Sequence, residues 1–97
     1  MNREQARDYI LARATDYLQR DKSGKGYICP ICGSGNGKNG TGITTKDGEH
    51  YTCWAGCFTN ISLIDLIGLA ERGLDPADTS RYPEKLQAAC DVFNITL

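Results

Sequence analysis

The chain has 97 residues, of which 40% are hydrophobic, and a formal net charge of −1. A chain of this length buries roughly 60 to 65% of its unfolded surface, so a small domain with an additional staple is expected. No apolar run approaches the roughly 20 residues of a membrane span, and Met1 is followed by Asn2, Arg3 and Glu4 rather than a signal segment. We therefore expect a soluble, cytoplasmic protein with no membrane partner and with its five cysteines reduced.

Charge is unevenly distributed along the chain. Residues 20–46 contain a single acidic side chain, Asp21, whereas the C-terminal third is acidic. The basic side chains of that segment are Arg20, Lys22, Lys25, Lys38 and Lys46. This pattern allows a basic face on a protein that is nearly neutral overall.

The first predicted element is an amphipathic helix over residues 3–20. Its apolar side chains recur at helical spacing, and the segment contains no Gly or Pro. Residues 27–29 predict a short β-type segment, and the Gly-, Ser- and Asn-rich residues 33–42 predict an exposed loop. Two strands follow, over 43–46 and 49–54, joined by Asp47-Gly48 in a type I′ turn.

Two further helices are predicted in the second half. The first covers residues 60–72, with Ser62 and Asp65 at capping-box spacing and Gly73 as its stop. The second starts at Pro83, a residue favoured at the first helical position. Its buried stripe is expected to contain Leu86, Ala89, Cys90 and Phe93.

These elements predict a small α+β fold, a zinc ribbon with a β-hairpin or a three- to four-stranded antiparallel sheet flanked by helices. We expect one compact domain in three segments. An N-terminal helix occupies 1–22, the zinc-ribbon core and its following helix occupy 23–73, and a C-terminal helix in 74–97 leads towards a catalytic core that this chain lacks.

Four cysteines have metal-ligand spacing. Cys29 and Cys32 are two residues apart in Cys-Pro-Ile-Cys-Gly, the form of a zinc knuckle, and Cys53 and Cys57 lie at the end of the predicted hairpin. The second pair is irregular because three residues separate its cysteines. Four thiolates suit one tetrahedral, structural Zn²⁺ with no open position for a catalytic water.

Other assignments of His50 and of the cysteines compete with this site. His50 precedes Cys53 by three residues and remains a substitute for Cys53 or Cys57 as a ligand. Structural core thiols and a redox Cys-x-x-C fit the loop context less well. Cys90 lies on an apolar stripe and is interpreted as a buried small hydrophobe.

Basic and aromatic side chains flank the cysteines. Sheets that bear such side chains bind single-stranded nucleic acid by stacking and phosphate contacts. Packing in the core is the alternative for Trp54 and Tyr27, and a solvated face is the alternative for the lysines. The candidate nucleic-acid-binding residues are Lys22, Lys25, Lys38, Lys46, Tyr51 and Trp54.

Three segments together resemble a known family. They are Tyr27-Ile28-Cys29-Pro30-Ile31-Cys32-Gly33, Tyr51-Thr52-Cys53-Trp54-Ala55-Gly56-Cys57 and Leu63-Ile64-Asp65-Leu66-Ile67. They look like the N-terminal zinc-binding domain of bacterial, phage and mobile-element DNA primases of the DnaG type. Cys32 stands where cellular primases commonly have His, which points to phage or conjugative-element relatives.

The resemblance implies a function in DNA replication. Such domains precede a TOPRIM-type nucleotidyltransferase core and help to select the single-stranded template site for RNA primer synthesis. It implies partners too: the template, that core in the same chain and a replicative helicase. The chemistry would belong to the core, so we expect this chain to be a non-catalytic N-terminal piece of a longer protein.

Two other classes of function remain as alternatives. A zinc-ribbon adaptor would use the helix Leu63 to Ala70 to bind a protein in a replication or transcription complex. A free-standing redox or metal-transfer protein would hold its metal loosely.

Overall fold

A computed structural model of the protein describes residues 1–21, 26–35 and 42–97. The chain divides into two compact units. Met1–Ala14 and Leu63–Leu97 form one of them, which we call the helical unit. Thr15–Ser62 form the other, the sheet unit. None of the helices in the described ranges is long and apolar enough to cross a membrane.

The N-terminal helical segment is interrupted. Helix α1 (Arg3–Leu11) begins with a capping box, in which the Asn2 side chain accepts a hydrogen bond from the Gln5 N–H at 2.8 Å and the Gln5 side chain accepts one from the Asn2 N–H at 3.1 Å. A separate short helix, α2 (Ala14–Tyr17), follows. The prediction of one continuous helix over 3–20 is therefore corrected.

The interruption has a local cause at Arg13. Its backbone N–H donates to the carbonyl of Ile10 at 3.0 Å instead of to Tyr9 four residues back. The Arg13 guanidinium donates to the Tyr9 carbonyl instead, at 3.2 Å. A tightened last turn and a basic side chain on a free carbonyl are common ways for a helix to end.

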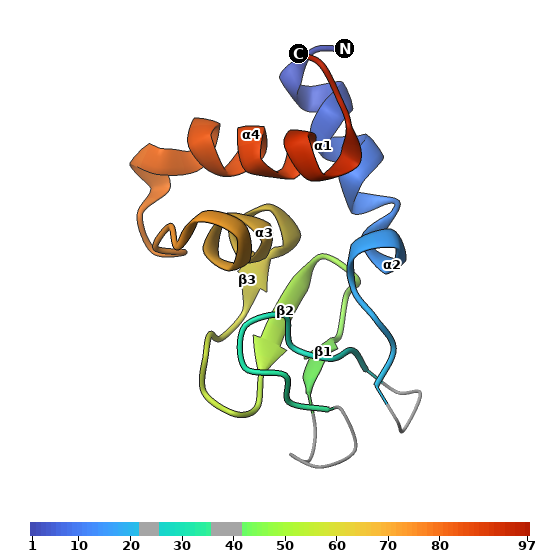
Figure 1. Cartoon of the computed structure of the whole chain (residues 1–97), viewed down its shortest axis with the longest axis vertical. Helices are drawn as coiled ribbons and strands as arrows, with labels where there is room; N and C mark the ends of the chain where they lie inside the picture. The colour runs from blue at the N-terminus through green and yellow to red at the C-terminus, as the bar shows by residue number, and fades with distance from the viewer. Residues whose placement is uncertain (22–25, 36–41) are drawn as a thin grey trace. The chain divides into compact units, whose positions relative to one another are not determined.

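Helices α3 (Leu63–Arg72) and α4 (Tyr82–Phe93) pack against each other in the helical unit, and α1 contacts both (Figure 1). A short 3₁₀ helix, η1 (Thr79–Arg81), precedes α4. Gly73 follows α3 with a φ of 67°, the left-handed conformation expected of a helix stop. The buried side chains of the unit include Ala6, Ile10, Leu63, Ile64, Leu66, Ile67, Leu86, Ala89 and Cys90.

A charged side chain lies inside this core. Lys85 is 0% exposed, and its ammonium donates to the Asp65 carboxylate at 3.0 Å and to the Asp78 carbonyl at 2.9 Å. Gly68 lies against it, since a Cβ added at Gly68 would be 2.6 Å from Lys85 Cγ.

Phe93, which was predicted to be buried on the stripe of α4, is only half-buried.

The sheet unit contains a three-stranded antiparallel sheet in the order β1-β2-β3 (Figure 1). Its strands are β1 (Ile43–Thr45), β2 (His50–Cys53) and β3 (Ile61–Ser62). Tyr27 adds a single bridge to Ile43, with two backbone hydrogen bonds of 2.9 and 2.8 Å. The predicted α+β class and antiparallel sheet are confirmed, whereas α3 begins at Leu63, after β3, rather than at residue 60.

The hairpin turn differs from the prediction. A type I′ turn needs positive φ at both Asp47 and Gly48, but only Gly48 has it, at 77°. Side chains close the turn instead. One Asp47 carboxylate oxygen accepts the N–H groups of Glu49 and His50, each at 2.8 Å, and the Thr45 hydroxyl accepts the Gly48 N–H at 2.9 Å. The turn is thus wider, because the Asp47 side chain accepts hydrogen bonds from the backbone two and three residues further on.

Candidate metal centre

The first pair of cysteines lies on a tight backbone turn. The Gly33 N–H donates to the Cys29 carbonyl at 2.9 Å, and Gly33 has a φ of 76° that few other residues adopt readily. The Cys29 N–H donates to the Ser34 carbonyl at 3.0 Å. This turn brings Cys29 and Cys32 to the same side of the loop, as a zinc knuckle requires.

The second pair is placed by the end of β2. Cys53 is the last residue of the strand, and its N–H donates to the Phe58 carbonyl at 3.0 Å. The Gly56 N–H donates back to the Cys53 carbonyl at 3.1 Å, with a Gly56 φ of 100°. The three intervening residues therefore form a compact loop that returns Cys57 to the vicinity of Cys53.

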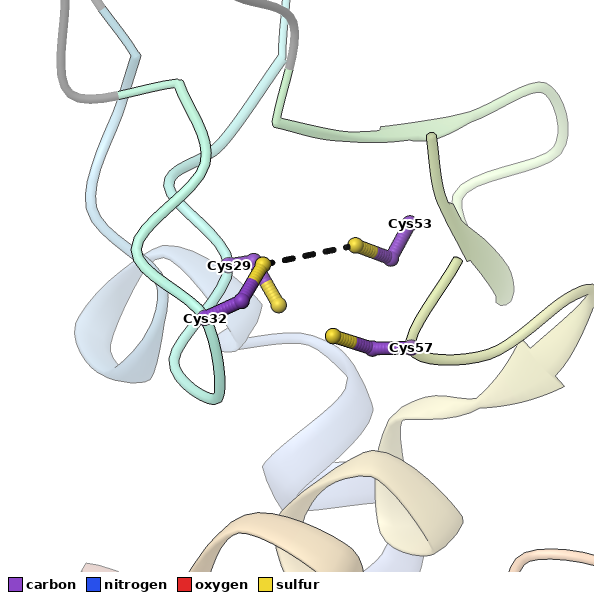
Figure 2. A group of neighbouring side chains, drawn as sticks. All are labelled: Cys29, Cys32, Cys53 and Cys57. Atoms are coloured by element: carbon purple, nitrogen blue, oxygen red, sulfur yellow. Dashed lines mark hydrogen bonds between the residues drawn. The ribbon is translucent and has the colours of Figure 1, made fainter. Parts of the chain in front are cut away.

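The four sulfur atoms converge on one small space, as Figure 2 shows. All four Sγ atoms lie within 4.8 Å of one another, and those of Cys32 and Cys53 are 3.8 Å apart. A tetrahedral ion with metal–sulfur bonds near 2.3 Å separates its ligands by about 3.8 Å. All five cysteines are free thiols, so the cluster can hold one metal ion, and the predicted group of four is the group that the fold assembles.

Ser34 adds a polar contact to the cluster. Its side chain is almost completely buried, and its hydroxyl lies 3.0 Å from Cys32 Sγ. A hydrogen bond from this hydroxyl lowers the pKa of the Cys32 thiol to about 6. Such a contact stabilises a thiolate and orients a metal ligand. Sequence reasoning missed Ser34, although its position directly after the knuckle glycine is a usable signal.

Two other thiols of the cluster have pKa values shifted in the opposite direction. Burial raises the pKa of Cys29 and that of Cys57 above the ordinary value for cysteine. Without a cation these two sulfurs favour their protonated forms. A metal ion that binds all four cysteines therefore has to displace protons from Cys29 and Cys57.

His50 does not join the four cysteines in the described part of the chain. Its Nδ1 lies 2.9 Å from the Asp47 carboxylate, in an exposed group formed by Asp47, Glu49 and His50. Cys90 is completely buried on α4 in the helical unit. The arrangement found is thus the all-cysteine one rather than the one with His50 as a ligand.

No protein-family model, no curated protein and no solved structure matches this chain. The assignment of the metal centre therefore depends on the geometry of the four cysteines, and the resemblance to DnaG-type primases depends on the sequence motifs alone.

The structure separates the predicted nucleic-acid-binding residues. Lys22, Lys25 and Lys38 lie outside the described residues. Trp54 is 63% exposed, and Lys46 is exposed as well and lines the same surface hollow. Tyr51 is 2% exposed, so it offers no face for stacking. Of the three candidates that the structure describes, Lys46 and Trp54 are therefore the exposed ones, and both line one hollow.

Strand alternation explains why Tyr51 and Trp54 differ. Side chains two residues apart share a face of a sheet, and adjacent ones do not. Thr52 and the exposed Trp54 line the outer hollow, whereas Tyr51 is buried and does not line it. Cys53 is also buried, although it contributes to the lining. Tyr51 packs edge-on against Tyr27, with ring centroids 6.3 Å apart. The period of two in the sequence was sufficient to separate these residues.

Proposed function

We propose that this chain is a zinc-binding, single-stranded DNA-binding domain that belongs to a DNA primase. The observation that carries the DNA-binding part is a hollow on the outer face of the sheet, which is lined both by the exposed Trp54, next in sequence to the ligand Cys53, and by the exposed Lys46. Proteins commonly bind single strands by stacking bases on exposed aromatic rings and by contacting phosphates with basic side chains.

We assign Zn²⁺ to the cysteine cluster. Four soft thiolates in a tetrahedral arrangement favour Zn²⁺ over hard cations such as Mg²⁺, and the 3.8 Å separation between Cys32 and Cys53 matches its bond lengths. With four protein ligands the ion is structural and holds the knuckle and the β2 loop together. The domain itself therefore supplies binding rather than catalysis.

The primase part rests on the motifs around Cys29, Cys53 and Leu63. In such a protein the domain would hold the template strand for a TOPRIM core that makes the RNA primer. A replicative helicase would be a further partner of that protein. Sequencing the coding region beyond Leu97 tests this part. A following TOPRIM segment is expected, whereas a stop codon or an unrelated domain would overturn it.

The adaptor alternative has less support. It requires the apolar side chains of the helix Leu63 to Ala70 to be available to a partner. Those of Leu63, Ile64, Leu66 and Ile67 are at most 1% exposed. The apolar face of this helix is therefore already covered within the helical unit.

Binding to single-stranded oligonucleotides at varied salt concentrations tests the DNA-binding part directly. The zinc-loaded chain is titrated into a labelled oligonucleotide of mixed sequence, and fluorescence anisotropy is measured between about 50 and 200 mM salt. We expect affinity that falls as salt rises, because phosphate contacts release counterions. A chain that loads with zinc but has no measurable affinity at the lowest salt would overturn the proposal.

A further inference from the structure

A hollow of about 470 Å³ lies on the outer face of the sheet. The hairpin turn borders it on one side and the segment from Cys53 to Asn60 on the other. Its volume falls within the range of about 300 to 1,000 Å³ that small-molecule sites occupy. The side chains that matter for its chemistry are those of Thr44, Lys46, His50, Thr52, Trp54 and Asn60.

The largest of these side chains is held in place. The Trp54 indole N–H donates to the Thr44 hydroxyl at 2.8 Å, and the Trp54 backbone N–H donates to the Gly42 carbonyl at 3.3 Å. The same loop is closed by the Gly56 to Cys53 hydrogen bond and ends at the ligand Cys57. An indole fixed in this way loses little further freedom when a flat ligand stacks on it.

The hollow also offers polar groups to a partner that can both donate and accept hydrogen bonds. Asn60 has a left-handed φ of 52°, and its backbone N–H is satisfied by the Thr52 hydroxyl at 2.9 Å. Its exposed side-chain amide offers one acceptor and two donors. The edges of nucleobases display such donors and acceptors, and single-strand-binding proteins read them there.

The described lining of the hollow contains one cation, Lys46, and one carboxylate, Asp47. The Asp47 carboxylate accepts two backbone N–H groups and lies against His50, so its oxygens are already engaged within the turn. Hydrogen bonds from His50 and from these N–H groups lower the pKa of Asp47, which keeps it ionised and bound within the turn. The Lys46 ammonium remains to meet a phosphate.

From these contacts we infer that the hollow binds one unstacked nucleobase of a single strand. The base stacks on Trp54, its edge meets the Asn60 amide, and the adjoining phosphate meets Lys46. This inference rests on the proposed function and adds to it a discrete base site. Stacking needs an open base face, so a fully paired duplex cannot enter the hollow.

The test uses Trp54 as its own reporter, because it is the only tryptophan of the chain. The zinc-loaded protein is titrated with a short single-stranded DNA and with the matching duplex. We expect the single strand to quench the tryptophan emission and the duplex to leave it unchanged. Trp54 variants lack this reporter, so their affinity is measured by the anisotropy of the labelled strand. The Trp54→Ala variant should bind the strand at least about fivefold more weakly, with an unchanged salt dependence.

Three variants locate the effect. Trp54→Phe keeps a stacking ring and should retain most of the affinity, whereas Lys46→Ala should weaken binding and reduce the salt dependence. Tyr82→Ala removes an exposed aromatic ring from the helical unit and should bind like the original chain. Zinc content measured for each variant verifies that the metal centre is intact.

The outcomes separate this inference from the proposed function. If the original chain binds the strand but Trp54→Ala binds it equally well, the base site is wrong and DNA binding stands. If the original chain binds no single strand, both the base site and the DNA-binding function are refuted. A free deoxynucleoside monophosphate that quenches the emission as strongly as the strand at equal concentration would overturn the role of the strand.

Discussion

Substitution of Gly42 by alanine tests how the fold supports the metal centre. A Cβ at Gly42 would lie 2.0 Å from the Tyr27 carbonyl oxygen and 2.6 Å from that of Ser34. Both contacts are with backbone, so no rotation of a side chain can relieve them. The bridge between Tyr27 and Ile43 must open or shift, which moves the segment that leads into the knuckle.

The expected cost follows from what is lost. The two hydrogen bonds of the Tyr27 bridge contribute about 0.5–1.5 kcal/mol each, and overpacking of a filled site costs about 1–3 kcal/mol. We therefore expect Gly42→Ala to lower the free energy of unfolding by about 2–6 kcal/mol. A small domain has only about 5–15 kcal/mol in total, so zinc-loaded Gly42→Ala should be much less stable.

Gly48→Ala is the matched control. No atom lies within 4 Å of a Cβ at Gly48, but its φ of 77° is unfavourable for alanine. The expected loss is therefore conformational only, about 1–2 kcal/mol. Denaturant unfolding of the zinc-loaded proteins, followed by circular dichroism, measures both. A Gly42→Ala variant that loses no more stability than Gly48→Ala would refute the steric argument.

Two further predictions concern the metal centre and the helical unit. Zinc affinity should increase as the pH rises through neutrality, because the pKa values of Cys29 and Cys57 are raised and both thiols release their protons when zinc binds. Affinity should fall further below pH 6, where the Cys32 thiol is protonated as well. Calorimetry in buffers of different ionisation enthalpy measures this proton release, and pH-independent affinity would contradict it. Lys85→Met removes the cation that pairs with Asp65 and should lower the free energy of unfolding by about 2–4 kcal/mol. This loss is smaller than for a fully buried ion pair, because the remaining Asp65 carboxylate is 24% exposed to water. Adding Asp65→Leu should restore part of that loss, and a double variant less stable than Lys85→Met alone would show that the ion pair is not the cause.

Local signals predicted much of this structure. The spacing of Cys29, Cys32, Cys53 and Cys57 identified the cluster, since metal knuckles depend on short-range geometry. Gly73 ends α3, and Pro83 lies in the first turn of α4, because both effects arise from one residue's own backbone preferences.

Features that depend on competing or distant contacts were not predicted. The Asp47-Gly48 dipeptide indicated a two-residue turn, but the Asp47 side chain bonds two backbone N–H groups and widens it. Lys85 is buried because its acceptors come from residues seven to twenty positions away, which helical periodicity does not reveal. Arg13 interrupts the first helix through a side-chain contact that competes with the helical pattern.

The buried Lys85 has a consequence for sequence variation. Its stem passes so close to Gly68 that any side chain there would displace it, and its charge is balanced by Asp65. In relatives of this chain, positions 65 and 85 should therefore vary together, because a relative with an apolar residue at 85 has no need of an acid at 65. Gly68 should persist in both kinds of relative, because the Cγ and Cβ of residue 85 lie 2.6 and 3.0 Å from where a Cβ at 68 would be.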